Sequence, residues 1–324
     1  MLVINQKQVE DILTMKACIQ VMEDVLKELA AGEAVQHLRS VVPIEKDNLM
    51  GLMPGYLRKE EVIGAKVITI YPENHQHGQP SHQGVVLLND AKDGSLKAVM
   101  DGTKITAIRT AAVSAVATKA LSKKDAEVLS LLGSGEQART HLEAILLARP
   151  IKQVNIWSRN MEKAKEWKAE MEQKYPVSIH VFETVEGAVR EADIICTLTA
   201  STEPILCGEW VMEGTHINAV GACKAADREL DSELVRKSLF YVDRVESALN
   251  ESGDYLFPLK EGVIDSNHIV GELGEVLTKK VHGRQSDSEI TIFESLGLAI
   301  EDLAAANFIY HEGVKSKKGT IISM

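Results

Sequence analysis

The feature that most constrains the fold is a glycine-rich turn between an apolar strand and a helix. The run VLSLL (128–132) leads into GSGEQA (133–138), and an amphipathic segment follows as far as Ala148. A G-x-G-x-x-A pattern in this context is typical of the phosphate-binding turn of a dinucleotide-binding domain. Gly133 permits the tight turn, and Gly135 leaves room for a pyrophosphate at the helix N-terminus. A glycine turn without a ligand is the alternative.

The segments around this turn alternate between strands and helices. Apolar strands recur at 154–159, 193–199, 216–220 and 239–243, with helical segments between several of them. Strands of this buried type that alternate with helices predict a parallel sheet covered on both faces. We therefore expect an α/β protein whose residues 122–294 form a Rossmann-type, doubly wound parallel sheet domain.

The pattern before residue 122 is different. It predicts a helix over 14–31, then short strands, a hairpin over 84–102 and an Ala-rich helix over 105–121. The long last helix of the sequence has the length to pack against this part. Residues 1–121 and 295–324 are therefore expected to form a second, discontinuous α+β domain.

The end of the second strand indicates which dinucleotide binds. An acidic residue about 20 positions after the glycines would bond the ribose of NAD. This position instead holds Ser158, Arg159 and Asn160. We predict a preference for NADP(H), with NAD(H) still possible, and place Arg159 on the 2′-phosphate. The alternative is that Arg159 is a solvated residue at a helix start.

The composition excludes several partners. Lys and Arg total 36 and Asp and Glu total 47, which gives a net charge of −11. Nucleic-acid binding and binding to an anionic membrane both need a basic face, so neither partner is expected. No apolar run approaches the roughly 20 residues of a membrane-crossing helix. The first residues do not read as a secretory signal, and the four scattered cysteines suit reduced thiols, so a cytoplasmic protein is expected.

Some charged residues occupy apolar stretches of the sequence, where burying a charge costs free energy. Lys66 lies inside an apolar, alternating strand, where it needs a partner or an exit to water. It either reaches solvent at the edge of the sheet or holds a substrate carboxylate. Arg39 is a second candidate for a carboxylate, because its planar fork matches the two oxygens. On its own, Arg39 also fits a surface salt bridge.

Histidines at 75, 77 and 82 share one loop. They lack a cysteine or carboxylate at zinc-motif spacing, so no metal site is expected. His82 could instead protonate or orient a substrate. Arg109 and Thr110, near the start of the Ala-rich helix, either meet the cofactor's pyrophosphate or form a surface pair.

Several strings together resemble one family. They are RSVVP, LMPGYL, PSHQGVVLL, LLGSGEQA, EPILCGEWV, HINAVGA, ALNESGD and ELGEV, and they extend from Arg39 to the last helix. This set is similar to the ornithine cyclodeaminase/mu-crystallin family, and within it to the mu-crystallin-like ketimine reductases. The resemblance implies a homodimer whose discontinuous domain binds substrate and forms the dimer, with an active site between this domain and the Rossmann domain.

The resemblance also implies roles for individual residues. Arg39 and Lys66 would bind the substrate carboxylate, His82 would lie near cofactor and substrate, and Glu251 would face the substrate. The remaining positions would contact the cofactor: Arg109, Thr110, Gly133, Ser134, Gly135, Glu136, Gln137, Ser158, Arg159, Asn160, Thr197, Leu198, Val220 and Ser295.

One departure from the family pattern bears on the reaction. Ornithine cyclodeaminases and the related alanine dehydrogenases carry an Asp after the Val-Gly-small segment, where this chain has Cys223. A thiol is a poor substitute for a carboxylate as acid or base. The substitution therefore favours reduction of a substrate that is already an imine.

The sequence thus predicts an NADPH-dependent reductase that converts cyclic ketimine carboxylates, such as Δ1-pyrroline-2-carboxylate or Δ1-piperideine-2-carboxylate, to proline or pipecolate. Arg39, Lys66 and His82 are the candidate catalytic residues. Two NAD-dependent alternatives are ornithine cyclodeaminase and an alanine-type amino-acid dehydrogenase. A non-catalytic protein that binds NADPH and a small molecule is an alternative of another class.

Overall fold

The computed structural model describes residues 1–46 and 48–323. The chain forms two compact units, the first from Met1–Arg109 with Gly297–Met324, and the second from Thr110–Leu296. The division falls inside helix α3 (Gly102–Leu121), which contributes residues to both units. The domain limits expected from the sequence, after 121 and before 295, stay predictions.

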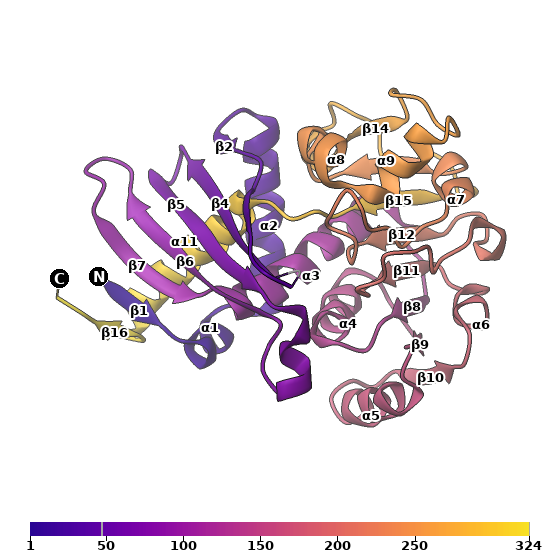
Figure 1. Ribbon diagram of the computed structural model, residues 1–324, viewed down its shortest axis with the longest axis horizontal. Coiled ribbons are helices and arrows are strands. Elements are labelled where there is room, and N and C mark those ends of the chain that lie inside the picture. Colours follow the sequence, from indigo (N-terminus) through magenta and orange to yellow (C-terminus); the bar gives the residue numbers. More distant parts are fainter. Residues whose placement is uncertain (47, 324) are drawn as a thin grey trace. The chain divides into compact units, whose positions relative to one another are not determined.

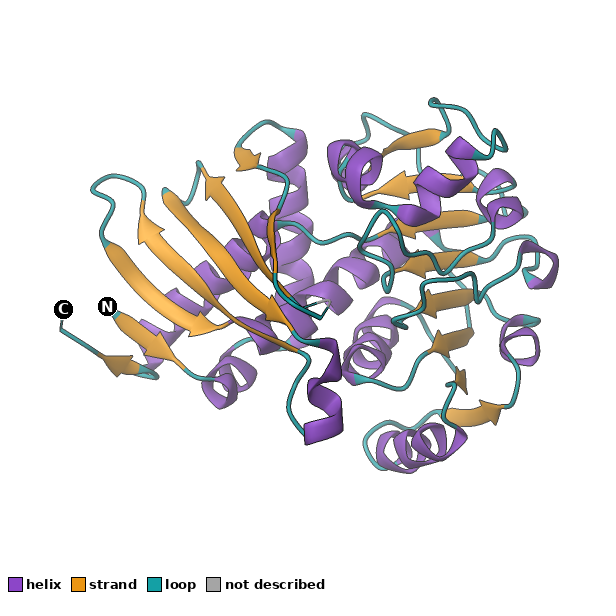
Figure 2. Cartoon of the chain, viewed as in Figure 1, coloured by secondary structure: helices purple, strands orange, loops and turns teal. Residues whose placement is uncertain are grey.

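The first unit is built on one mixed sheet (Figures 1 and 2). Its strand order is β16-β1-β7-β6-β5-β4-β2, and β3 pairs with β4. β1 and β7 are parallel, whereas the other neighbouring pairs are antiparallel. The strands are β1 (Leu2–Ile4), β2 (Ala34–Gln36), β3 (Ser40–Pro43), β4 (Leu49–Leu57), β5 (Val62–Ile70), β6 (His82–Asp90), β7 (Leu96–Asp101) and β16 (Thr320–Ile321).

Helices cover one face of this sheet. The last helix, α11 (Ala299–Ser316), packs on β4, β5 and β6 and on α2 (Met15–Ala30). Figure 1 shows α11 crossing the strands, with α1 (Gln6–Ile12) near β7. In β4 the side chains that face α11 are buried, as at Met53 and Leu57, and Leu52 on the opposite face is exposed. The period of two in the sequence therefore sets which side of the sheet forms the core.

The second unit is a wholly parallel sheet of order β10-β9-β8-β11-β12-β15-β13-β14. Its strands are β8 (Val128–Leu132), β9 (Gln153–Trp157), β10 (Ser178–Phe182), β11 (Ile194–Thr197), β12 (His216–Ala219), β13 (Leu239–Val242), β14 (Ile269–Glu272) and β15 (Thr291–Glu294). Its helices are α4 (Glu136–Ala148), α5 (Met161–Glu172), α6 (Val185–Val189), α7 (Ser232–Arg236), α8 (Val245–Glu251), α9 (Gly253–Lys260) and α10 (Leu273–Leu277).

Two apolar clusters bury the sheet of the second unit. One gathers around Phe240, Ile217 and Leu234, and the other around Leu129, Ile156 and Trp167. Strands buried by helices on both faces are continuously apolar, which explains runs such as VLSLL and IICT. The doubly wound parallel sheet and the α/β class predicted from the sequence are confirmed.

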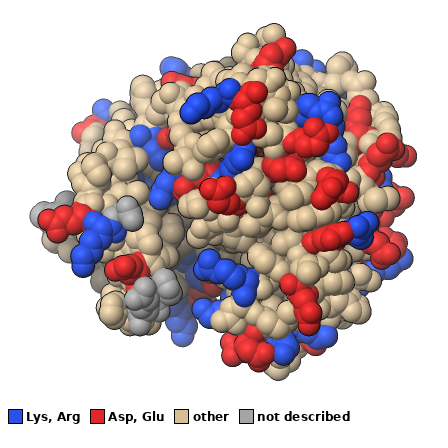
Figure 3. Space-filling view, turned by 45° about the vertical axis from the view of Figure 1, so that its right-hand side comes forward, with Lys and Arg blue, Asp and Glu red and all other residues tan. Residues whose placement is uncertain are grey.

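Acidic and basic side chains are interspersed on the face that Figure 3 shows. Across residues 1–46 and 48–323, no helix combines the length and the apolar character needed to cross a membrane.

Candidate active site

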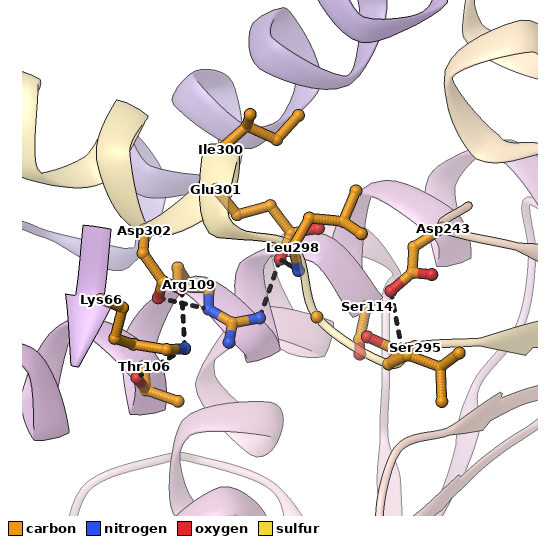
Figure 4. A network of polar contacts seen from close by, with 12 residues as sticks. Lys66, Thr106, Arg109, Ser114, Asp243, Ser295, Leu298, Ile300, Glu301 and Asp302 are labelled. Carbon is orange, nitrogen blue, oxygen red and sulfur yellow. Dashed lines mark hydrogen bonds and ion pairs between the residues drawn. The ribbon is translucent and has the colours of Figure 1, made fainter. Parts of the chain in front are cut away.

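Lys66 is buried at the centre of the first unit. It lies in the middle of β5, where its backbone faces Met53 of β4 and Val86 of β6. The strand pleat turns its side chain to the helix-covered face, and only 2% of the residue is exposed. The ammonium group lies 2.7 Å from Oδ2 of Asp302 in α11 and 3.5 Å from Oγ1 of Thr106 in α3 (Figure 4). Lys66 is therefore an internal cation, not an edge lysine that extends into water.

Arg109 belongs to the same network. Its Nε donates to Oδ1 of Asp302 at 2.9 Å, and its Nη1 donates to Oε2 of Glu301 at 2.8 Å. Asp302 therefore joins both cations, one through each carboxylate oxygen (Figure 4). Glu301 also accepts from the backbone N–H of Leu298 at 3.2 Å, which ties the network to the start of α11.

The network sets the electrostatics of this unit. Burial lowers the pKa of Lys66 to about 8, against the opposing effect of Asp302. Burial likewise raises the pKa of Glu301, against the opposing effect of Arg109. The cations Lys66 and Arg109 contact the carboxylates Asp302 and Glu301. Such contacts are needed because a charge that is removed from water is costly without a partner. The buried thiol of Cys18 lies within the field of this group, and burial raises its pKa.

Arg39 and His82 differ in their relation to Lys66. Arg39 stands just before β3, where it is half-buried, and its charge lowers the pKa of Lys66. Its Nη2 lies 3.5 Å from the carbonyl oxygen of Gly297. His82 begins β6 opposite Ile70, so it lies four residues, or about 13 Å, along the strands from the level of Lys66. It is exposed, and its Nδ1 lies 2.9 Å from Oγ of Ser81. The structure thus brings Arg39 into the field of Lys66, and the role of His82 stays a prediction.

The sequence did not predict how Arg109 is used. Its guanidinium binds Glu301 and Asp302, and its predicted contact with cofactor phosphates stays a prediction, as does that of the buried Thr110. The two carboxylates were missed entirely. The signal was present in LGLAIEDLAAA, because adjacent acids inside an apolar helix must meet buried cations.

The glycine loop of the second unit has the form that a dinucleotide requires. Gly133 follows β8 with φ +126°, and a Cβ there would lie 2.6 Å from the carbonyl oxygen of Leu198. Gly135 is the N-cap of α4 and offers no side-chain hydrogen bond to the helix. A Cβ on Gly135 would meet nothing within 4 Å. Open space in front of the N-terminal turn of a helix fits a pyrophosphate.

The loop after the second strand adjoins this glycine loop. Ser134 Oγ donates to Ser158 Oγ at 3.0 Å, and the backbone N–H of Asn160 donates to the same oxygen at 3.3 Å. The Asn160 side chain caps α5 by accepting from the N–H of Lys163 at 3.1 Å. Arg159 is exposed between them. These residues place hydroxyl and amide groups and one cation beside the glycine turn. The contact of Arg159 with a 2′-phosphate stays a prediction.

The other predicted cofactor residues lie at the carboxyl ends of neighbouring strands. Thr197 ends β11, Val220 follows β12 and Ser295 follows β15, and all three are buried. The backbone N–H of Leu198 donates to the carbonyl oxygen of Leu132 at 2.8 Å, beside Gly133. Ligands of open parallel sheets bind at this edge. Glu136 and Gln137 begin α4 there, so the structure brings the predicted loop and strand ends to one edge.

Cys223 lies at the same edge. Its Sγ is 3.4 Å from the carbonyl oxygen of Val220 and 4.0 Å from that of Ser295. Glu251 ends α8 and is half-buried. The thiol therefore lies at the strand end. The roles of Cys223 and Glu251 toward a substrate stay predictions.

Buried carboxylates brace the loops at this edge, and the sequence did not predict them. Glu229 accepts from the N–H of Thr199 at 2.8 Å and of Gly221 at 2.9 Å. Asp243 accepts from the N–H of Leu296 at 2.7 Å. Glu294 accepts from Ser252 Oγ at 2.5 Å, and Asp254 accepts from the N–H groups of Glu229 and Leu230. Burial raises the pKa of Asp254 to about 8 and that of Glu294 well above its usual value.

No group of three or more His, Cys, Asp or Glu side chains among the described residues has the arrangement of a metal site. The side chain of His75 lies outside what the structure describes, so the expectation of no metal stays a prediction.

Comparisons with known proteins extend over nearly the whole chain. The model of the ornithine cyclodeaminase/mu-crystallin family matches residues 1–318. The ketimine reductase mu-crystallin of Mus musculus is 44% identical over 282 residues, 86% of this chain and 85% of that protein. The Thermococcus litoralis Δ1-pyrroline-2-carboxylate reductase, solved with NADH and L-proline, is 42% identical with a TM-score of 0.97, covering 99% of this chain and 100% of that one.

A second solved structure is an archaeal alanine dehydrogenase dimer with bound NAD. It is 33% identical with a TM-score of 0.95, covering 100% of this chain and 99% of that one. The two solved structures match this chain over nearly its full length, and the resemblance seen in the sequence from Arg39 to the last helix is confirmed. The chain therefore belongs to the ornithine cyclodeaminase/mu-crystallin family and is an oxidoreductase that uses a nicotinamide cofactor.

Proposed function

We propose that this protein reduces cyclic ketimine carboxylates with NADPH, converting Δ1-pyrroline-2-carboxylate to proline and Δ1-piperideine-2-carboxylate to pipecolate. The observation that carries the proposal is the internal cation Lys66, held by Asp302 at 2.7 Å within the field of Arg39. A fixed, largely desolvated cation attracts a carboxylate more strongly than a solvated one. The two relatives named for ketimine and pyrroline-2-carboxylate reduction support the substrate class.

The residues of the first unit bind and orient the substrate. Lys66 and Arg39 hold the carboxylate, which fixes the position of the neighbouring C=N carbon. Glu251 of the second unit faces the substrate, and His82 lies near it. Holding a reactant in one orientation lowers the barrier mainly through entropy. The protonated imine carbon is already electrophilic, so the chain has to position it rather than activate it.

The residues of the second unit hold the cofactor. When bound, the nicotinamide supplies the hydride. Residues 133–137 and the start of α4 bind the pyrophosphate, aided by Arg109 and Thr110. Thr197, Leu198, Val220 and Ser295 line the path of the dinucleotide along the strand ends.

The preference for NADPH over NADH rests on one stretch of the chain. Ser158, Arg159 and Asn160 follow β9, and none of them is acidic. A guanidinium matches a phosphate in charge and geometry, whereas an acid at this place would repel it. The two solved relatives hold NADH and NAD, so relative rates with both cofactors decide this part of the proposal.

Cys223 favours imine reduction over deamination. A cyclodeaminase must move protons to and from a substrate amine, for which the expected Asp is suited. The thiol of Cys223, beside the carbonyls of Val220 and Ser295, is a poor replacement. The ketimine needs no such step, because its C=N bond is already formed.

Initial rates test the function directly. The purified protein is assayed with NADPH and with NADH against both cyclic ketimines, against pyruvate with ammonia, and against ornithine. We expect NADPH oxidation with the ketimines, independent of ammonia, and a higher kcat/KM for NADPH than for NADH. Ammonia-dependent oxidation would identify an amino-acid dehydrogenase, and ammonia release from ornithine a cyclodeaminase. Binding of NADPH without turnover would identify a non-catalytic binder.

We also propose that the protein is a homodimer formed through the uncovered face of the first sheet. That face exposes apolar side chains, among them Val42 at 51%, Ile63 at 46% and Leu52 at 38%. Apolar residues gathered on one face mark an interface more often than a solvated surface, and one solved relative is a dimer. Light scattering should give twice the chain mass, and Ile63→Lys should give the monomer. A monomeric wild type would refute the proposal.

A further inference from the structure

Asp302 uses both of its carboxylate oxygens on cations. Oδ2 lies 2.7 Å from the Lys66 ammonium, and Oδ1 accepts from Arg109 Nε at 2.9 Å. None of the three groups is more than 5% exposed in its side chain. By contacting both cations, Asp302 of α11 fixes the directions of two side chains, that of Lys66 in β5 and that of Arg109 in α3, as Figure 4 shows.

We propose that Asp302 is a positioning residue for the reaction: by bridging Lys66 and Arg109 it keeps Lys66 charged and aimed, and thereby sets the upper pH limit of substrate binding. This inference rests on the function proposed above, because it concerns the same substrate carboxylate. Asp302 does not touch the substrate itself and acts through Lys66.

The charge balance around Lys66 supports this role. Asp302 contacts both Lys66 and Arg109, Glu301 contacts Arg109, and the charge of Arg39 also acts on Lys66. Without Asp302, Lys66 would lose the carboxylate that it contacts while the charges of Arg109 and Arg39 still act on it, and a lysine loses its proton far more readily than an arginine.

The groups that act on Lys66 come from α11, from α3 and from the segment before β3. Asp302 raises its pKa from α11, and Thr106 and Arg109 contact it or act on it from α3. Arg39 lowers its pKa from the segment before β3. The charges of Arg109 and Lys66 lower the pKa of Glu301, against the effect of burial. Cys18 of α2 stays a neutral thiol because burial raises its pKa. Asp302 is therefore the largest influence that opposes the loss of charge by burial.

The pH dependence of kcat/KM for the ketimine tests the proposal. In the wild type this quantity should fall as the pH rises through about 8, where Lys66 loses its proton. Asp302→Asn keeps the size of the side chain and removes the charge. Because an opposite charge at this distance changes a pKa by about one to three pH units, the fall should move to lower pH by that amount.

The same variant should separate binding from turnover. Above the lowered limit, the KM for the ketimine should rise about tenfold for each pH unit by which the limit has moved, because the charged form of Lys66 is scarcer. The KM for NADPH should stay at the wild-type value. A merely structural role for Asp302 would lower the amount of active enzyme without moving the pH limit or separating the two KM values.

Glu301→Gln is the matched control, because it removes an equally buried neighbouring carboxylate that pairs with Arg109 instead of Lys66. Its pH limit should lie closer to that of the wild type. If Asp302→Asn does not fold, Asp302→Ser removes the same charge and keeps a hydroxyl near Arg109. A wild-type pH limit in the folded Asp302 variant would overturn this inference and leave the proposed function standing. A wild type that reduces no ketimine would overturn the proposed function instead.

Discussion

The Gly135→Ala substitution tests whether the glycine loop holds the cofactor. Gly135 has φ −83° and ψ −165°, a conformation open to alanine, and its added Cβ would meet no atom within 4 Å. The free protein should therefore keep its stability, or gain up to about 1 kcal/mol because alanine restricts the unfolded chain. In the complex, however, the methyl group would occupy space that the pyrophosphate needs.

The expected loss of affinity follows from the cost of overpacking. One methyl group in a close-packed contact costs about 1 to 3 kcal/mol, which is about a 5- to 150-fold rise in the Kd for NADPH. Calorimetric titration with NADPH measures the Kd, and thermal unfolding without ligand measures stability. The result would be a protein as stable as the wild type that binds NADPH more weakly.

Gly133→Ala is the matched comparison. Gly133 has φ +126°, and its Cβ would lie 2.6 Å from a backbone oxygen of Leu198. This variant should lose about 1 to 3 kcal/mol or more of stability even without cofactor. If Gly135→Ala bound NADPH as tightly as the wild type, the pyrophosphate would not lie at the start of α4, and the role assigned to this loop would be refuted.

Three further predictions concern charges. Lys66→Met should raise the KM for the ketimine about 150-fold, because a lost buried ionic contact costs about 3 kcal/mol. The Kd for NADPH should stay unchanged. An unchanged KM for the ketimine would exclude Lys66 from carboxylate binding. Arg159→Ala should raise the KM for NADPH by at least about tenfold and leave the KM for NADH unaltered. The control is Arg190→Ala, which removes an exposed arginine paired with Glu186 and should change neither KM. An equal rise in both KM values for Arg159→Ala would contradict the contact with the 2′-phosphate. Because burial raises the pKa of Asp254 to about 8, the stability that this carboxyl contributes is present below about pH 4 and is lost as the pH rises to about 8. Urea unfolding should therefore show the wild type losing stability relative to Asp254→Asn over this range, and parallel curves would count against the raised pKa.

The nucleotide half of the molecule could be predicted because its signals are local. The G-x-G-x-x-A turn specifies a strand, a tight turn and a helix within twenty residues, and the alternation of apolar strands specifies the parallel sheet. Gly133 and Gly135 occupy the conformations that these roles require. A short stretch of sequence was enough to predict the strand, turn and helix because these residues determine the local backbone directly.

The network around Lys66 was predicted only in part because it joins distant segments. A lysine in an apolar strand signals a partner, but its identity depends on which helix packs over that strand. Asp302 is 236 residues away from Lys66 in sequence (302 − 66), and Glu301 is 192 residues away from Arg109. The buried carboxylates Glu229 and Glu294 were missed for the same reason, since their backbone and hydroxyl partners come from separate loops.

Reduction with deuterium-labelled cofactor tests the central claim most directly. The wild type is incubated with Δ1-piperideine-2-carboxylate and NADPH that carries deuterium at the transferred position of the nicotinamide. We predict pipecolate with one deuterium on the carbon that bears the carboxylate, and one NADPH consumed for each product molecule. Pipecolate without the label at that carbon, or no pipecolate at all, would contradict the account.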